Sequence, residues 1–372
     1  MEAVTSQPTV SDDFTTPSSA PFTGLDEQVT PDEHLPEQRA AFRAVLVAFF
    51  VVSMAWGNIG NPLVMATILT QRKLRQNVAN VFIFNLAIAD FCVTSFVDLS
   101  YVLGNVIPDL LIKNRVFCGF AAAVCIISCT CSLWSITAIS INRYVCVAKS
   151  ALYPRVYTRR NTLLMAAAVW LICFLIDLPN LVGLGAHVFD AKKRGCSFDR
   201  LDHYGYTLYF IGMGVVTPMT IVIICYIKTF LFVREHNMKI QTWQTDVGSG
   251  DGQAVAPGPA KKPIDTRLLK TVVVIFLVFL ACWTPYTIIV LSDLRNTYPD
   301  ELYVAAIIFA HANSSMNSIV YGIMNRSFRQ GYKNLIRVLT RGCLCNTEHH
   351  GSGTDNQTSN HRVTAGAQGS RR

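Results

Sequence analysis

The sequence contains seven apolar blocks, each long enough to cross a lipid bilayer. A membrane-spanning helix needs about 20 mainly apolar residues in a row. Most of each block also lacks the regular polar face of a helix on a soluble protein. The blocks cover residues 44–69, 78–103, 116–147, 163–188, 205–232, 269–292 and 302–324. This pattern predicts an all-α membrane protein built as a bundle of seven transmembrane helices.

Composition supports this prediction, because 51% of the residues are hydrophobic and only 15% are charged. A soluble domain usually carries about 25% charged residues. The first forty residues are acidic, rich in Ser, Thr and Pro, and lack the apolar core of a cleaved signal peptide. The expected organisation is a disordered extracellular tail (1–40), the bundle (41–325) with a flexible third inner loop at about 234–266, an amphipathic membrane-surface helix (326–342) and a disordered cytoplasmic tail (343–372).

The distribution of Lys and Arg predicts how the bundle is oriented, because cytoplasmic loops carry an excess of basic residues. The short connections 71–77 and 148–162 are rich in basic residues, whereas 104–117 and 293–301 are poor in them. We therefore expect a multi-pass protein of the plasma membrane with its N-terminus outside and its C-terminus in the cytoplasm. The net charge of +8 is then assigned to a membrane surface, and no motif indicates binding to nucleic acid.

The segment "NRSFRQGYKNLIRVL" after the seventh block predicts an eighth, amphipathic helix on the inner leaflet. Its apolar residues fall on one helical face and its basic residues lie elsewhere, which suits contact with membrane lipid. Cys343 and Cys345 follow at once and are candidates for acylation. The alternative is a soluble tail with two free thiols.

Of the twelve cysteines, most lie in apolar blocks, where they behave as small apolar residues. Cys118, at the outer start of the third span, and Cys196, in the second outer loop, face an oxidising compartment. We predict a disulfide between them that ties this loop over the outer mouth of the bundle. Two free thiols are the alternative.

Asp90 lies in the middle of the second span, where an ionisable group needs an explanation. Hydroxyl and amide side chains at similar depth in other spans are expected to surround it. They are Asn61, Ser132, Asn313, Ser314 and Asn317. Such an oxygen-rich site suits a small hard cation, here an allosteric Na⁺, and we expect no other cofactor. A hydrogen-bonded polar core that only sets helix packing explains the residues equally well.

Two spans contain a proline that removes a backbone hydrogen bond and bends the helix. Pro285 in the sixth span has Phe279 and Trp283 nearby, and Pro218 in the fifth precedes Tyr226. An aromatic side chain at such a bend could rotate against a ligand and swing the inner half of the helix. The alternative is that the prolines are merely tolerated, as in many membrane helices.

Arg143 stands at the inner end of the third span and needs a partner for its charge. Its neighbour Asn142 is neutral. Asp265 lies about 30 Å inward of Pro285 along the sixth helix. We predict that Asp265 pairs with Arg143 in one state and releases it in another, since a ligand can shift only states that differ in their contacts.

Taken together, these residues resemble the rhodopsin-type (class A) family of G-protein-coupled receptors over residues 41–345. The residues that carry the resemblance are Gly60, Asn61, Val64, Asp90, Cys118, "NRY" at 142–144, Trp170, Pro179, Cys196, Pro218, Tyr226, "CWTP" at 282–285 and Asn317 to Tyr321. Each is weak alone, but their order and intervals are very specific. The resemblance implies a receptor with an extracellular ligand that activates a heterotrimeric G protein.

The resemblance also implies roles for individual residues. Arg143 and Tyr144 would face the G protein, with Asp265, Tyr226, Asn317 and Tyr321 in the same switch. Asp90, Ser132, Asn313, Ser314 and Asn317 would form a sodium pocket. Trp283 would be the activation toggle, together with Phe279, Pro285 and Pro218. Phosphorylated Ser and Thr residues of the tail would recruit arrestin.

Within this family the sequence is most similar to melatonin receptors, through "INRYVCVAKSALYPRVYTRRNT", "LPNLVGLG" and "VVTPMTIVIICYIK". Asn142 and Ser318, which depart from the usual acid and proline of the family, also occur in that subfamily. The resemblance implies ligand contacts at Asn180 and Phe198, and coupling to the inhibitory class of G protein. Arg200 stands where the subfamily has Gln, and the expected histidine before Pro218 is absent. Both departures argue against melatonin as the ligand.

The remaining ligand candidates are Asp98, Arg200, Tyr286 and His311. Cys125 replaces the aspartate that binds amines in monoamine receptors, and His311 replaces the lysine that binds retinal in opsins. His311 either pairs with Asp98 or binds an acceptor on the ligand. Arg200 either holds an acidic group of the ligand or is a solvated loop charge.

Other functions find less support. A receptor for a peptide or acidic lipid is the main alternative. A transporter or channel predicts internal repeats and broken helices, which the sequence lacks. An enzyme is not expected, because no nucleophile, base and orienting group are spaced for catalysis and no metal ligands cluster.

Overall fold

The structure of the protein is a computed structural model that describes the backbone of residues 35–248 and 267–348. Side chains are described within 40–240 and 270–338, except Val272. Clustering of contacts separates two units, Met1–Phe42 and Arg43–Arg372. The second unit contains the helical bundle, and the helix that begins at Leu35 in the first unit continues into it.

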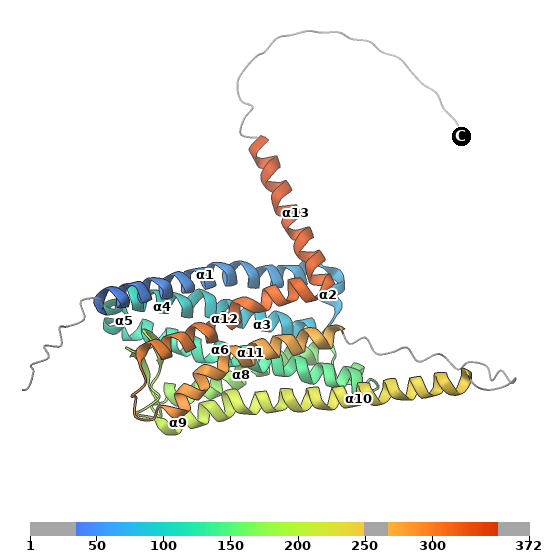
Figure 1. Ribbon diagram of the computed structural model, residues 1–372. Coiled ribbons are helices and arrows are strands. Elements are labelled where there is room, and N and C mark those ends of the chain that lie inside the picture. The colour runs from blue at the N-terminus through green and yellow to red at the C-terminus, as the bar shows by residue number, and fades with distance from the viewer. Residues whose placement is uncertain (1–34, 249–266, 349–372) are drawn as a thin grey trace, which may run out of the picture. The chain divides into compact units, whose positions relative to one another are not determined.

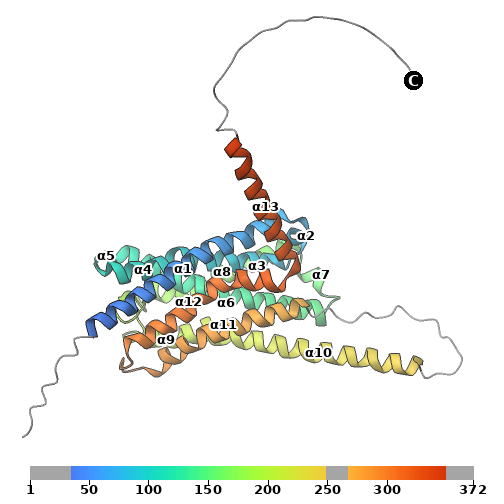
Figure 2. The same ribbon diagram turned by 45° about the horizontal axis from the view of Figure 1, so that its top comes forward.

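Long helices that lie side by side dominate the described part of this unit (Figures 1 and 2). The first helix, α1, begins at Leu35 and ends at Thr70. The others are α3 (Asn80–Cys92), which continues through the π-helical turn η1 (Val93–Val97) into α4 (Asp98–Val106); α6 (Arg115–Ala148); α8 (Arg159–Leu181); α9 (Tyr204–Tyr209), which continues through η2 (Phe210–Val216) into α10 (Thr217–Gly248); α11 (Arg267–Ser292); and α12 (Asp300–Met324).

Helix α6 is the centre of the packing, because it contacts α3, α8, α10 and α11. Its buried residues include Leu133 and Ile136, which belong to the main apolar core together with Phe276 and Phe279 of α11. Helix α11 also packs along α12. The arrangement agrees with the predicted bundle.

Six helical segments among the described residues are long and apolar enough to cross a membrane. They correspond to the first six predicted blocks. Helix α12 falls outside this set because its interior carries several buried polar residues. These are His311, Asn313, Ser314, Asn317 and Ser318. The polarity that weakens the hydropathy of α12 thus faces the other helices.

Two helix ends differ from the sequence prediction. Helix α8 ends at Leu181, not near 188. Gly183 follows it with a φ of 86°, a left-handed conformation that commonly ends helices. Helix α10 runs to Gly248, so the helix continues past residue 234, where a flexible loop was expected. The reason is local, because no Gly or Pro interrupts the sequence between Pro218 and Gly248.

A hairpin follows α8, with β1 (His187–Asp190) antiparallel to β2 (Gly195–Phe198). The register pairs His187 with Phe198 and Asp190 with Gly195. Short helices make the remaining turns. They are α2 (Arg72–Gln76), α5 (Pro108–Lys113) and α7 (Tyr153–Val156). We call the end of the bundle with the hairpin the disulfide end, and the opposite end the Arg143 end.

The last helix, α13 (Arg326–Glu348), leaves the Arg143 end of α12 at an angle (Figure 1). Its first turns are held by aromatic contacts, because Phe328 stacks on Tyr321 with ring centroids 5.1 Å apart. The hydroxyl of Tyr332 also donates a 3.2 Å hydrogen bond to the backbone oxygen of Ser318. A helix thus follows α12 where an eighth helix was predicted, and it extends beyond the expected end at 342. The side chains of Cys343 and Cys345 lie outside the described residues.

Candidate functional site

A small cavity lies inside the disulfide end of the bundle. It is lined by Tyr101, Cys125, Ile126, Cys129, Ser197, Phe198, Phe210, Trp283, Tyr286, Ile307, Ala310 and His311. The space open to a water-sized sphere is only about 20 Å³. Pockets for drug-sized ligands measure about 300–1,000 Å³, so side chains or the hairpin must shift before such a ligand can enter. Of the predicted ligand residues, Phe198, Tyr286 and His311 line this cavity.

The hairpin forms one wall of the cavity and is tied to α6. Cys118 and Cys196 form the predicted disulfide. It joins the start of α6 to the middle of β2, whose residues are all buried. Because Ser197 and Phe198 follow the disulfide directly, the cross-link places them in the cavity wall.

Lys193, in the turn of the hairpin, places its ammonium group beside the cavity and is only 1% exposed. Its Nζ lies 2.9 Å from Asp190 Oδ2 and donates a 3.3 Å hydrogen bond to Ser197 Oγ. The same group lies over the rings of Phe198 and Tyr286, at 5.5 and 5.9 Å from their centroids. Lys193 was not among the predicted ligand residues. Its only signal was a basic residue close to Cys196.

The ion pair between Lys193 and Asp190 shifts the pKa of both groups. Burial alone would raise the pKa of Asp190, but the Lys193 charge and the backbone N–H groups of Lys192 and Lys193 outweigh it and lower that pKa. Burial alone would lower the pKa of Lys193, but the Asp190 carboxylate outweighs it and raises that pKa. Both shifts favour the charged forms, so the pair is ionic at neutral pH.

Arg200 joins the loop after β2 to the loop between α11 and α12. Its guanidinium donates 2.7 Å hydrogen bonds to the backbone oxygen of Asp293 and to Asn296 Oδ1. It also lies 3.5 Å from Asp293 Oδ2 and 4.9 Å from the ring centroid of Tyr303. Arg200 is 5% exposed and is therefore not a solvated charge. It does not line the cavity, and a ligand contact there stays a prediction.

Lys192 strengthens the same connection between the loops. Its Nζ donates to the backbone oxygens of Asn296 and Tyr298, at 2.8 and 2.6 Å. We call Lys192, Arg200, Asp293 and Asn296 the loop clasp. The clasp holds the hairpin over the cavity from the side of α11 and α12.

Asp293, the acidic member of the loop clasp, has a lowered pKa. Burial alone would raise it, but the Tyr303 hydroxyl and the backbone N–H groups of Thr297 and Tyr298 stabilise the carboxylate and bring its pKa to about 2. These bonds measure 2.7, 2.6 and 3.1 Å. The carboxylate is therefore charged at neutral pH.

His311 and Asp98 form the pair that the sequence offered as one alternative. His311 Nδ1 and Asp98 Oδ1 are 2.7 Å apart, and the hydroxyl of Ser53 donates a 3.0 Å hydrogen bond to Asp98 Oδ2. The ring of Tyr101 packs against the imidazole, with centroids 4.9 Å apart. Asp98 thus orients the imidazole and does not itself line the cavity. Ser53 was missed because its spacing carries no motif.

Asn180 is buried near the cavity but is not part of its wall. Its side-chain amide donates a 2.9 Å hydrogen bond to Asp177 Oδ1, which His187 Nε2 also approaches at 3.0 Å. The Oδ1 atom of Asn180 finds no hydrogen-bond donor among the described residues. Asn180 therefore stands in a polar cluster between α8 and β1, and a ligand contact there stays a prediction.

Asp90 lies at the centre of the bundle and is fully buried. Ser132 Oγ donates to Asp90 Oδ1 at 3.0 Å, and Asn317 Nδ2 donates to Asp90 Oδ2 at 2.7 Å. Nearby, Asn61 Nδ2 donates to the backbone oxygen of Ser314 at 3.1 Å. The side-chain oxygens of Asn61, Asn313 and Asn317 are buried and accept no hydrogen bond from the described residues. The predicted polar centre therefore assembles.

Aromatic residues link the cavity to the middle of α11. Trp283, which lines the cavity, stacks on Phe279 with centroids 5.7 Å apart. Trp283 Nε1 is buried and finds no acceptor among the described residues. The two prolines lie within helices: Pro285 lies inside α11, and Pro218 lies in the first turn of α10, where its backbone oxygen accepts a 3.4 Å hydrogen bond from Thr137 Oγ1.

At the Arg143 end, Tyr226 joins α10 to α6. Ser140 Oγ donates a 3.3 Å hydrogen bond to the Tyr226 hydroxyl, and the Tyr226 ring packs on Phe276 at 5.9 Å. Arg143 lies close enough for its charge to act on the hydroxyls of Tyr226 and Tyr321. Within the described residues Arg143 makes no ion pair, and its buried Nε has no acceptor. The predicted partner Asp265 lies outside the described residues.

The neighbours of Arg143 differ in burial. Asn142 is buried and donates a 3.4 Å hydrogen bond to the hydroxyl of Tyr153 in α7. Tyr144 is half-buried. Asn142 thus anchors α7 to α6 and leaves the Arg143 charge uncompensated by its neighbour.

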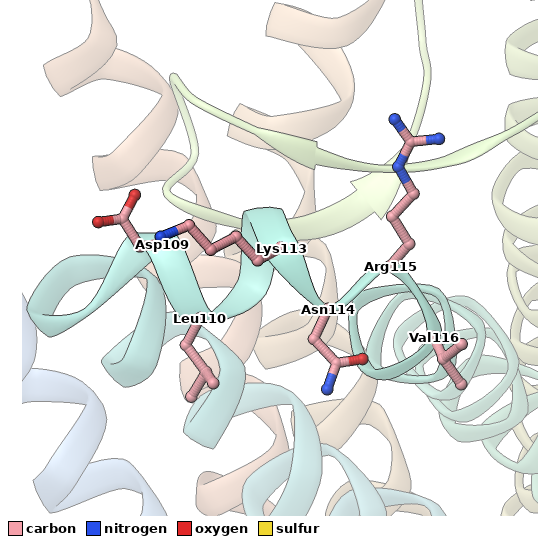
Figure 3. Close-up of a pocket in the computed structure, with 6 residues that line it drawn as sticks. All are labelled: Asp109, Leu110, Lys113, Asn114, Arg115 and Val116. Carbon is pink, nitrogen blue, oxygen red and sulfur yellow. The ribbon is translucent and has the colours of Figure 1, made fainter.

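A larger hollow, about 670 Å³, lies at the disulfide end on α5 and the start of α6 (Figure 3). It is lined by Asp109, Leu110, Lys113, Asn114, Arg115 and Val116. The labelled side chains point in different directions and do not converge on a common point (Figure 3). We therefore place the functional site in the enclosed cavity.

Comparison with known proteins agrees with this geometry. The profile of the seven-transmembrane receptor (rhodopsin) family matches residues 60–321. Melatonin receptor type 1B-B of Danio rerio is 30% identical over 80% of this chain and 82% of its own length. Melatonin receptor type 1A of Phodopus sungorus is 30% identical over 82% and 84%. Squid rhodopsin shares the fold, with a TM-score of 0.66 at 22% identity over 82% of this chain and 87% of its own.

These matches cover most of the bundle, including the disulfide, Asp90 and Arg143. Members of the family bind an extracellular ligand and couple to G proteins. The chain is thus a multi-pass membrane receptor that belongs to the rhodopsin family of G-protein-coupled receptors and is similar to melatonin receptors.

Proposed function

We propose that this receptor lies in the plasma membrane with its disulfide end outside, binds a small extracellular ligand in the enclosed cavity, and activates a G protein of the inhibitory class. The orientation rests on the excess of basic residues in 71–77 and 148–162. The G-protein class rests on the similarity to melatonin receptors.

One observation carries the proposal: side-chain contacts connect both ends of the bundle. Trp283 lines the cavity and stacks on Phe279. Further along α11, Phe276 packs on Tyr226, which is hydrogen-bonded to Ser140 one turn from Arg143. A ligand that displaces Trp283 would therefore disturb the packing that surrounds Arg143. Such a two-state packing change is what a ligand needs in order to act at a distance.

The shape of the cavity favours a small ligand over a peptide, because the hairpin and the loop clasp cover it. Two departures from the melatonin-receptor pattern argue against melatonin as the ligand. Arg200 stands where that subfamily has Gln, and the histidine expected before Pro218 is absent. The buried ammonium of Lys193 gives specific support to the alternative, an acidic lipid, because it could pair with a carboxylate in place of Asp190.

The centre at Asp90 fits Na⁺, as the resemblance implied. One carboxylate and several buried amide oxygens without donors supply the ligands that a hard cation prefers. Asp90, Ser132, Asn313, Ser314 and Asn317 would hold the ion. A bound cation would stabilise the charged form of Asp90 and so the packing of α3 against α12.

The tail adds three further proposals. The α13 helix lies on the inner leaflet, Cys343 and Cys345 are acylated there, and phosphorylated residues beyond it recruit arrestin. The similarity to rhodopsin-family receptors and the amphipathic sequence of α13 support them.

Substitution of Arg143 tests the proposed function. Arg143→Ala should abolish nucleotide exchange on an inhibitory-class G protein while the receptor still reaches the cell surface. Arg159→Ala, an exposed basic residue at the start of α8, serves as the matched control and should leave exchange unchanged. Normal exchange by the Arg143→Ala receptor would refute the proposed coupling.

A further inference from the structure

Cys125 is a free thiol that faces the enclosed cavity. Two neighbours lie close enough to interact with its sulfur: His311 on α12, and Cys129, one turn further along α6. Both neighbours also line the cavity and are buried. The sulfur therefore lies where a histidine and a second thiol converge, a grouping that the spacing of these residues in the sequence does not indicate.

The histidine is oriented by a third group. His311 Nδ1 is bonded to Asp98 Oδ1, and Asp98 is in turn fixed by Ser53. In the tautomer that donates Nδ1–H to the carboxylate, Nε2 is the free ring nitrogen that can accept a proton. A thiol, an imidazole and an orienting carboxylate in this order are the arrangement that activates cysteine nucleophiles. The tertiary structure thus assembles the nucleophile, base and orienter whose spacing was absent from the sequence.

A separate observation points to a bound molecule. Trp283 is 8% exposed and lines the cavity, yet its Nε1–H has no acceptor among the described residues. A buried donor without a partner is costly, and an oxygen on a ligand would satisfy it. The other walls near Cys125 are apolar or aromatic, as at Ile126, Phe198 and Phe210.

We propose that Cys125 captures small, apolar α,β-unsaturated carbonyl compounds by forming a covalent bond. His311 Nε2 takes the proton from the thiol, and the sulfur bonds to the β-carbon of the compound. The electrons of the carbon–carbon double bond move to form an enolate, whose oxygen accepts a hydrogen bond from Trp283 Nε1. The imidazolium then returns the proton to the α-carbon. The S–H bond and the π bond break, one S–C and one C–H bond form, and no oxidant or leaving group is needed.

This inference rests on the proposed function only in using the same cavity as the ligand site. The adduct can be detected without any G protein, so its test is independent of signalling. The open space of about 20 Å³ also limits the class of ligand. A flat, small compound needs the least displacement of the hairpin.

The test treats purified full-length receptor, with its native disulfide intact, with 2-cyclopenten-1-one and follows each cysteine by peptide mass spectrometry. Cys125 should gain the mass of the enone at least about 10-fold faster than Cys92 and Cys146, which are half-buried free thiols. Equal or slower labelling of Cys125 in the unmutated receptor would overturn the proposal without reliance on any variant.

Variants then test the role of the histidine. His311→Gln should slow labelling of Cys125 by about 100-fold, the scale of general-base assistance. His187→Gln is the matched control, because it removes another histidine paired with a buried aspartate, Asp177, outside the cavity wall. That control should leave the rate at Cys125 unchanged. An unchanged rate in His311→Gln would show that the thiol is not activated as proposed. Nucleotide exchange in the same preparations reports separately on the proposed receptor function.

Discussion

Arg200 and Asp293 join two loops that are 93 residues apart in the chain, through a 2.7 Å hydrogen bond from the guanidinium to the Asp293 backbone oxygen. The carboxylate of Asp293 lies 3.5 Å from the same guanidinium. The bond is buried on both sides, so the hairpin over the cavity is fixed by contacts that water does not replace.

Removal of the guanidinium should weaken the loop clasp. Arg200→Gln takes away the charge partner of a buried carboxylate, but Asp293 keeps its bonds to Thr297, Tyr298 and Tyr303. We expect the free energy of unfolding to fall by about 1–3 kcal/mol. The measurement is the thermal unfolding midpoint of the purified receptor, followed by tryptophan fluorescence.

The control for this substitution is Arg194→Gln. Arg194 lies in the turn of the same hairpin and makes no ion pair with any described residue. Its midpoint should match that of the unmutated receptor. Equal midpoints for Arg200→Gln and Arg194→Gln would mean that the clasp adds nothing to stability.

Acid should weaken the same clasp in a defined pH range. The pKa of Asp293 is lowered from its ordinary value of 3.8 to about 2 in the folded protein. A carboxyl group whose pKa is lower in the folded than in the unfolded protein stabilises the folded state. For Asp293 this stabilisation is fully present above about pH 4 and is lost as the pH falls towards 2. The difference in unfolding midpoint between the unmutated receptor and Asp293→Asn should therefore be largest above pH 4 and shrink below it. A difference that stays constant from pH 6 to pH 3 would contradict this reading of the carboxylate.

Sodium should stabilise the receptor through Asp90. Raising NaCl should increase the unfolding midpoint of the unmutated receptor more than N-methylglucamine chloride of equal ionic strength, because the proposed site at Asp90 is buried and Na⁺ is the much smaller cation. Asp90→Asn keeps the shape of the side chain but removes its charge, so the specific effect of Na⁺ should vanish. If both salts act alike on the unmutated receptor, the centre is a hydrogen-bonded core without an ion. This experiment needs no knowledge of the ligand.

Much of the fold followed from the sequence, because the thickness of a bilayer fixes how long an apolar block must be. The ends of the helices could be predicted less well from the sequence. Gly183 ends α8 through its own backbone conformation, and α10 continues to Gly248 because nothing in its sequence stops it. Local conformations of this kind do not change hydropathy, so the blocks could not show them.

The residues of the site also differ in how well the sequence predicted them. Asp90 and Asn317 could be placed together because a polar residue inside a membrane needs polar neighbours, and few were available. Phe198 followed from the resemblance to melatonin receptors. The partners of Arg200 could not be predicted, because loops have no period and their contacts depend on how the hairpin closes.

The sequence by itself determined that the chain is a multi-pass membrane receptor with seven apolar blocks, and it predicted the disulfide that ties the second outer loop to the third span. It did so because hydropathy and compartment are properties of short stretches of chain. Only the tertiary structure decided that Lys193 turns towards the cavity while Lys192 binds the loop between α11 and α12. It also decided that Cys125 lies beside His311. Those contacts join side chains from different helices and loops, and their geometry exists only once the helices have packed.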